Sequence, residues 1–187
     1  MSTSSDDTSL DPGFRADVEK RSGALVSACF HCMKCTNGCP ISYAMDIVPN
    51  RLMRMIQLGL RDRVLSSSTI WICASCETCT TRCPNDIDVA RVMDSLRQMS
   101  VKADTVAEPQ VPMFHDAFLA ALKRTGRVHE LEMIARYKLK NRNLLADARL
   151  GWEMFKRGRL KLFPEKIAEV KEVRHIFEQA EERSSGT

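Results

Sequence analysis

The chain has 187 residues, of which 44% are apolar and 28% charged, and its formal net charge is +4. This length suits one compact domain or a small domain with an appended helical region. Charged residues interrupt every apolar run before it reaches the roughly 18 residues of a membrane span, so the sequence predicts no transmembrane segment. The amino terminus lacks the basic start and apolar middle of a secretory signal, which predicts a cytoplasmic protein.

The amino-terminal residues 1–13 are rich in Ser, Thr, Asp and Gly and show no apolar periodicity. Such a composition is typical of disordered termini. We therefore predict a disordered tail and place its boundary with the first domain at residue 20.

Residues 29–40 (CFHCMKCTNGCP) and 73–84 (CASCETCTTRCP) form an internal repeat with the spacing C-x2-C-x2-C-x3-C-P. This spacing is typical of bacterial ferredoxins, in which the first three cysteines of a motif hold one [4Fe–4S] cluster and the fourth holds the other cluster. We therefore predict two [4Fe–4S] clusters with crossed ligation. The expected ligands are Cys29, Cys32, Cys35 and Cys83 for cluster 1, and Cys73, Cys76, Cys79 and Cys39 for cluster 2.

Two other uses of eight cysteines fit less well. Disulfides form in oxidising compartments, and the chain begins without a secretory signal. Zinc ribbons use two separated cysteine pairs, which gives no reason for a third cysteine at the same spacing or for the closing proline. Because fully thiolate-ligated iron offers no open position to a substrate, we predict electron transfer and no catalytic residue on this chain.

Helices are predicted on both sides of the second motif. One begins near Pro49, and its apolar face is formed by Leu52, Met55, Ile56 and Leu60. The next follows a cap at Asp86 or Asp88, and its apolar face is formed by Val89, Val92, Met93, Leu96 and Met99. Residues 104–112 carry two prolines and no periodicity, so they are predicted to be a linker.

Four more helices are predicted beyond the linker, because apolar residues recur there at helical spacing. Their first apolar residues are Phe114, Val128, Leu144 and Ile167, and the last helix is expected to start at Pro164. Strand patterns are nearly absent, so the predicted fold class is all-α. We expect a cluster-binding domain over residues 21–103 and a helical carboxy-terminal region over residues 104–187 that docks onto a partner.

Residues 136–161 hold nine Arg or Lys against two acidic residues. A basic face can bind nucleic acid. Two redox clusters already account for the protein, however, so we expect no nucleic-acid partner and interpret this segment as a solvated face or a surface for an acidic partner. No G-x-G-x-x-G loop occurs, so the sequence does not support a flavin or nicotinamide site.

The two cysteine motifs are separated by one predicted helix and followed by another. This arrangement resembles the α-helical ferredoxin domain found in iron–sulfur subunits of succinate dehydrogenase and of several flavin-linked oxidoreductases. The match is more specific over residues 25–140. Four segments resemble the C subunit of heterodisulfide reductase. They are the first motif, VPNRLMRMIQLGL, IWICASCETCTTRCPNDIDVARVMDSLR and the segment starting at PQVPMF. The resemblance implies an α-helical ferredoxin domain, and the apolar periodicity beyond it predicts a helical carboxy-terminal extension. The amino-terminal tail and the last forty or so residues lie outside the resemblance.

The resemblance also implies the electron-transfer subunit of an oxidoreductase complex. Such a subunit relays single electrons through two [4Fe–4S] clusters between an A-like subunit, with flavin and iron–sulfur clusters, and a B-like subunit with CCG motifs. This chain has no CCG motif, so a disulfide-reducing site is not expected on it. The alternative is an iron–sulfur subunit of another flavin-linked dehydrogenase, of the succinate, fumarate, glycolate or glycerol-3-phosphate type.

Overall fold

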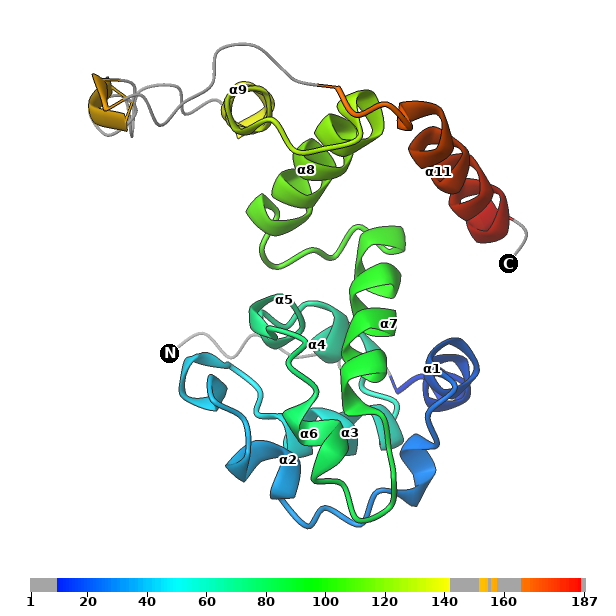
Figure 1. Cartoon of the computed structure of the whole chain (residues 1–187). Coiled ribbons are helices and arrows are strands. Elements are labelled where there is room, and N and C mark those ends of the chain that lie inside the picture. The colour runs from blue at the N-terminus through cyan, green and yellow to red at the C-terminus, as the bar shows by residue number, and fades with distance from the viewer. Residues whose placement is uncertain (1–9, 142–151, 155, 158–165, 186–187) are drawn as a thin grey trace. The chain divides into compact units, whose positions relative to one another are not determined.

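The computed structural model describes residues 10–141, 152–154, 156–157 and 166–185. Within these residues the regular secondary structure is helical and contains no strand, which confirms the predicted all-α class. The chain divides into two compact units, Met1–Glu108 and Pro109–Thr187, and Figure 1 shows the helices of each. In the described part of the chain, no helix is both long and apolar enough to cross a bilayer.

The first unit carries both cysteine motifs. Helix α7 is its central element, because α1, α4, α5 and α6 all pack against it. Helix α3 in turn contacts α1, α2 and α4. The elements are α1 (Phe14–Ser22), η1 (Val26–Ala28), α2 (Lys34–Asn37), η2 (Ser42–Ala44), α3 (Pro49–Gln57), α4 (Arg61–Leu65), α5 (Thr69–Ile72), α6 (Thr78–Thr81) and α7 (Val89–Lys102).

The helix predicted between the motifs is α3. It starts at Pro49 as expected, since proline is preorganised for the first helical position. It ends at Gln57, before Gly59 adopts a φ of 76°, so Leu60 lies beyond the helix. Met53, 1% exposed, faces the core in place of the predicted Met55.

The helix predicted after the second motif is α7. Of the two candidate caps, Asp88 is the one used, because its carboxylate accepts a hydrogen bond from the Arg91 N–H at 3.0 Å. Asp86 has a φ of 51° in the loop before it. The predicted apolar face is buried along its whole length, from Val89 to Met99.

Helix α1 occupies residues that the sequence predicted as the end of a disordered tail. Phe14 and Val18 on α1 are fully buried, and the helix packs on α3 and α7. The Asp11 N–H donates to the Gly59 carbonyl at 2.9 Å, and a Cβ at Gly59 would lie 2.4 Å from the Asp11 carbonyl oxygen. The structure therefore differs from the predicted tail at residues 14–20. The pattern FRADVEKRS has only two large apolar residues, Phe14 and Val18, about one turn apart, which is too weak to predict a helix.

The second unit contains α8 (Gln110–Thr125), α9 (Glu130–Asn141) and α11 (Val170–Ser185), and α8 contacts both others. Helix α8 starts inside the predicted linker, because Pro109 and Pro112 sit at its cap and first turn, where a missing N–H costs nothing. Helix α9 matches the helix predicted from Val128. Helix α11 begins at Val170, later than predicted. Most of the predicted helix from Leu144 and most of the basic segment 136–161 lie outside the described residues, while residues 152–154 are helical.

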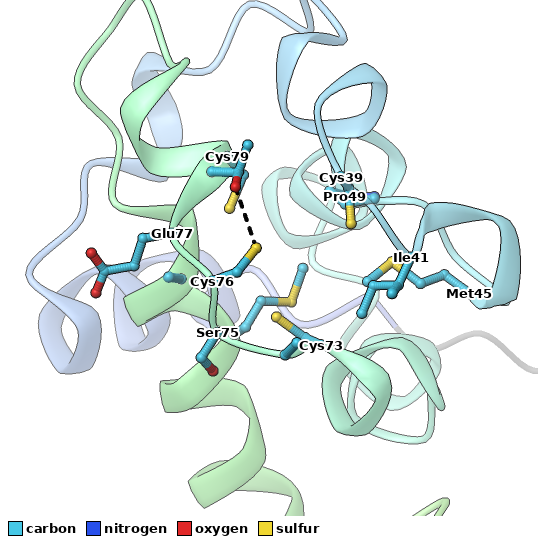
Figure 2. A pocket seen from close by; sticks show the side chains of 13 residues that line it. Cys39, Ile41, Met45, Pro49, Cys73, Ser75, Cys76, Glu77 and Cys79 are labelled. Carbon is cyan, nitrogen blue, oxygen red and sulfur yellow. Dashed lines mark hydrogen bonds between the residues drawn. The ribbon is translucent and has the colours of Figure 1, made fainter.

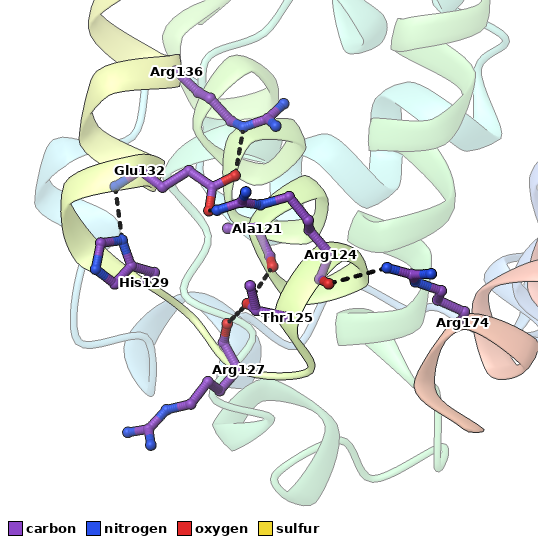
Figure 3. Close-up of polar contacts among 8 residues, drawn as sticks. All are labelled: Ala121, Arg124, Thr125, Arg127, His129, Glu132, Arg136 and Arg174. Carbon is purple, nitrogen blue, oxygen red and sulfur yellow. Dashed lines mark hydrogen bonds and ion pairs between the residues drawn. The ribbon is translucent and has the colours of Figure 1, made fainter. Parts of the chain in front are cut away.

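Polar contacts join these three helices at the carboxyl end of α8 (Figure 3). The Glu132 carboxylate of α9 accepts hydrogen bonds from Arg124 of α8 and from Arg136, the latter at 3.1 Å. The Arg174 guanidinium of α11 donates to the carbonyls of Lys123 and Arg124 at 3.3 Å. The two Arg174 contacts satisfy terminal carbonyls of α8 that have no partner within the helix.

Candidate functional site

The eight cysteines line two cavities in the first unit. Cavity 1 is lined by Cys29, Cys32, Cys35 and Cys83, and cavity 2 by Cys73, Cys76, Cys79 and Cys39. The fourth cysteine of each motif therefore lines the cavity of the other motif. Figure 2 shows Cys39 across cavity 2 from the three cysteines of the second motif.

The donor set of each cavity fits an iron–sulfur cluster. All eight cysteines are free thiols, so none is consumed by a disulfide. Within the described part of the chain, no group of three His, Cys, Asp or Glu side chains is placed to hold a single metal ion. Each cavity instead offers four sulfurs around a hollow, which is the ligand set of a [4Fe–4S] cluster.

The two motif loops follow the same backbone path. In each loop the residues on both sides of the second cysteine have positive φ: 60° and 63° at His31 and Met33, 50° and 58° at Ser75 and Glu77. For non-glycine residues this conformation costs about 1–3 kcal/mol each and is concentrated at functional sites. Alternating left- and right-handed residues also form concave N–H arrays that bind anions, including iron–sulfur clusters. Sequence reasoning missed these residues, because no glycine marks them.

A threonine follows the third cysteine of each motif and ties its loop to a helix. The Thr36 hydroxyl accepts from the Asn50 N–H at 3.0 Å and donates to the Asn50 Oδ1 at 2.7 Å, at the start of α3. The Thr80 hydroxyl accepts from the Ala90 N–H at 3.3 Å and donates to the Asp88 Oδ1 at 3.1 Å, at the start of α7. The shared Cys-Thr pair was the sequence signal for this role.

The amino ends of α3 and α7 border both cavities. Pro49 and Ala90 line cavity 2, and Asn50 and Val89 line cavity 1. A helix amino terminus carries a partial positive charge and stabilises a negative group beside it. A fully thiolate-ligated cluster is negatively charged, so both helices favour its binding.

Gln57, the last residue of α3, holds the loop of the first motif. Its Nε2 donates to the carbonyls of Val26 and Cys29, both at 3.0 Å, which uses both amide hydrogens. Its Oε1 lies 2.8 Å from Nε2 of His31 and must accept, so His31 carries a proton on Nε2. This network fixes the loop around the first cysteine of cavity 1.

Arg97 of α7 holds the loop of the second motif in the same way. Its guanidinium donates to the carbonyls of Ile70 and Cys73 and, at 3.1 Å, to the Ser75 hydroxyl. The Arg97 side chain is only 16% exposed. Neither Gln57 nor Arg97 was predicted, because both act on residues more than 20 positions away in the chain.

Three of the cysteine thiols have shifted pKa values. Burial raises the pKa of the Cys35 thiol to about 11, and burial also raises the pKa of Cys79. The exposed Cys76 has a lowered pKa, because the Thr78 hydroxyl at 3.4 Å stabilises its thiolate. Since iron binds thiolates, loading of either cavity must displace a proton from a half-buried cysteine, Cys35 or Cys79.

Asp46 links the two chain segments that meet at cavity 2. Its carboxylate accepts from the hydroxyls of Ser67 at 2.8 Å and Thr69 at 2.6 Å, and from the N–H groups of Ser68 at 3.1 Å and Thr69 at 2.9 Å. Thr69 begins α5, which leads directly into Cys73. Desolvation opposes ionisation, but these hydrogen bonds outweigh it and hold the pKa of Asp46 well below its usual range.

Replacing Asp46 with alanine should lower the free energy of unfolding by about 1–2 kcal/mol at neutral pH, the usual order of cost of losing a hydrogen-bonded charged acceptor. The pKa is depressed in the folded state, so this contribution is fully present above the ordinary carboxyl pKa of about 4 and is lost as the pH falls further. Anaerobic denaturation at pH 7 and at pH 3 measures it. Asp62→Ala, at an exposed carboxylate on α4, is the control. Because folded Asp46 stays ionised well below pH 4, the deficit should be only partly reduced at pH 3. A deficit that grows as the pH falls below about 4 would contradict the role of the ionised Asp46.

Known proteins resemble the part of the chain that carries the two cysteine motifs. Residues 28–88 match the model of the family described as 4Fe-4S dicluster domain. The chain is 34% identical over 83 residues to the iron-sulfur C subunit of the CoB–CoM heterodisulfide reductase of Methanopyrus kandleri, covering 44% of this chain and 43% of that protein. It is 34% identical over 85 residues to the C subunit of the ferredoxin:CoB-CoM heterodisulfide reductase of Methanosarcina mazei, covering 46% and 52%.

A third relative is the C subunit of the H(2):CoB-CoM heterodisulfide,ferredoxin reductase of Methanothermobacter marburgensis, 29% identical over 98 residues, with 52% of this chain and 53% of that protein covered. The chain thus spans about half the length of the curated relatives it matches. These matches confirm the predicted resemblance to the C subunit of heterodisulfide reductase and the predicted cofactor, two [4Fe–4S] clusters in a dicluster domain with two groups of four cysteines.

Proposed function

We propose that this chain is the electron-transfer subunit of a heterodisulfide reductase-like complex. It relays single electrons between an A-like subunit with flavin and iron–sulfur clusters and a B-like subunit with CCG motifs. The observation that carries the proposal is the pair of cavities in one unit, each lined by four cysteines drawn from both motifs. The similarity to the C subunits of heterodisulfide reductases supports this particular complex.

We also propose crossed ligation. Cys29, Cys32, Cys35 and Cys83 hold the cluster at cavity 1, and Cys73, Cys76, Cys79 and Cys39 hold the cluster at cavity 2, as the cavity linings support. When bound, such clusters supply one-electron transfer and leave no iron position open to a substrate. The protein positions the cysteine ligands. Gln57 and Arg97 hold the two cysteine loops, while α3 and α7 place their amino ends beside both cavities.

The rim of cavity 1 has the character of a docking surface for a partner protein. Cys32 is exposed there, and Phe30 and Met33 beside it are 60% and 47% exposed. Large apolar side chains grouped on a surface mark sites of interaction. The second motif has Ala74 and Glu77 at the corresponding positions. We propose that the B-like subunit binds over the rim of cavity 1.

Anaerobic affinity purification of the tagged chain from its host should recover a CCG-motif protein, identified by mass spectrometry. Met33→Glu places a charge in the apolar rim and should weaken that recovery at least tenfold, the loss expected at an interface hot spot. Ala74→Glu, at the other motif, is the matched control and should leave recovery unchanged. A flavoprotein partner without CCG motifs would support the alternative dehydrogenase function. Recovery of neither kind of partner would contradict both.

A further inference from the structure

The internal repeat of the first unit extends beyond the cysteines to the residues that hold them. Thr36 binds the N–H of Asn50, and Thr80 binds the N–H of Ala90. Gln57 and Arg97 each follow that bound residue by seven positions, on α3 and α7. The two side chains therefore occupy corresponding places in the two halves.

Their contacts also correspond. Each side chain donates to the carbonyl of the first cysteine of its motif, Cys29 or Cys73, and to the carbonyl three positions earlier. Each also bonds the side chain two positions after that cysteine, which is His31 in one half and Ser75 in the other. The same structural role is thus filled by a neutral amide at cavity 1 and by a guanidinium at cavity 2.

The charge of Arg97 is poorly screened. Its side chain is 16% exposed, and its acidic neighbour Asp94, 3.9 Å away, is 63% exposed and so compensates weakly. Cys73 and Ser75, which the guanidinium bonds, both line cavity 2. Glu77 also lines this cavity, but its carboxylate points away from the sulfurs (Figure 2).

The cationic side chains nearest in sequence to the cysteines of cavity 1 are of a different kind. Lys34 and Arg82 belong to exposed residues, so water and salt screen their charges. The position that corresponds to Arg97 holds Gln57, which is uncharged. Arg54, whose guanidinium donates to the Gln57 Oε1 at 3.3 Å, is exposed as well. Among the cations compared at the two cysteine loops, only Arg97 is therefore largely buried.

We infer that Arg97 raises the reduction potential of the cluster at cavity 2. The inference rests on the proposed function, because it requires both cavities to be loaded. Uptake of one electron adds one negative charge at cavity 2, and a nearby buried positive charge stabilises that state. The guanidinium keeps its proton throughout, so only the electron moves. Arg97 is a positioning residue that also sets how readily cavity 2 accepts an electron.

The test is Arg97→Gln, which installs the side chain that already performs this role at cavity 1. In one of the two titrating clusters, the ratio of reduced to oxidised cluster at a fixed ambient potential should be at least tenfold lower than in the wild type. A tenfold change corresponds to a reduction potential lowered by about 59 mV for a one-electron couple. The other should stay unchanged. The measurement is a redox titration of the anaerobically purified full chain, followed by electron paramagnetic resonance. Lys102→Gln removes the same charge from the exposed end of α7 and should shift neither cluster.

Arg97→Lys keeps the positive charge but changes the hydrogen-bonding geometry. Its reduced-to-oxidised ratio should remain within about threefold of the wild-type ratio. A fall in this ratio as large as that in Arg97→Gln would overturn the role of charge. An Arg97→Gln protein with full iron content and an unshifted titration would overturn the inference and leave the proposed function intact, whereas a wild-type chain without clusters would remove the function itself. If Arg97→Gln does not load, the reciprocal Gln57→Arg decides. It should raise the potential at cavity 1, and a loaded variant without that rise overturns the inference.

Discussion

Replacing Cys83 with alanine should empty or damage cavity 1 and leave cavity 2 loaded, although Cys83 belongs to the second motif. Cys83 lines cavity 1 together with Cys29, Cys32 and Cys35. Loss of one of four ligands removes an iron or the whole cluster, so we expect iron to fall by about one to four atoms per chain from a full load of about eight. Iron analysis and electron paramagnetic resonance of the anaerobically purified variant measure this loss.

Double variants identify which cavity Cys83 serves. If Cys83 and Cys32 hold the same cluster, Cys83→Ala combined with Cys32→Ala should lose no more than one cluster. Combined with Cys76→Ala, it should affect both clusters, because Cys76 lines cavity 2. The opposite pattern would refute crossed ligation. Cys39→Ala provides the reciprocal experiment. Combined with Cys76→Ala, it should lose no more than one cluster.

Replacing Phe14 with alanine should lower the free energy of unfolding by about 3–5 kcal/mol, the usual cost of deleting a buried aromatic ring. Phe14 is 0% exposed and lies on α1, which packs against α3 and α7. Since α3 and α7 border both cavities, the variant should also release iron at a lower temperature than the wild type does. Anaerobic thermal unfolding, followed by circular dichroism and by cluster absorbance, measures both effects.

Phe30→Ala is the matched control for Phe14→Ala. Phe30 is 60% exposed, so the same truncation should change the free energy of unfolding by less than about 0.5 kcal/mol. Equal effects of the two substitutions would contradict the packing of α1 on the cluster-binding unit. In that case the sequence-based interpretation of residues 14–20 as a tail would be the better description.

The features that the sequence predicted are those that depend on residues close together in the chain. The spacing of the cysteines predicted two groups of four. Pro49 marked the start of α3, and Asp86 and Asp88 were the two candidates for the start of α7, which the structure places after Asp88. The apolar face of α7 has five residues at helical spacing, which is a strong signal. Helix α1 offered only Phe14 and Val18, and its stability comes from packing that no local pattern records.

The residues that hold the cysteine loops could not be predicted, because their contacts with distant residues leave no local pattern in the sequence. Gln57 and Arg97 act on carbonyls, and every residue type has a carbonyl, so nothing in the sequence marks the acceptor. His31 and Glu77 have positive φ without being glycine, and loop closure around the cysteines imposes that conformation. Alignment of the two motifs with each other could have found Thr36 and Thr80, since both follow the third cysteine.

The central claim is that this chain holds two redox-active [4Fe–4S] clusters. It is tested most directly by iron and sulfide analysis of the anaerobically purified chain, combined with a reductive titration on the same sample. We predict about eight iron and eight sulfide atoms per chain and the uptake of about two electrons. Bound zinc, iron near four atoms per chain, or a sample that accepts no electrons would contradict the account.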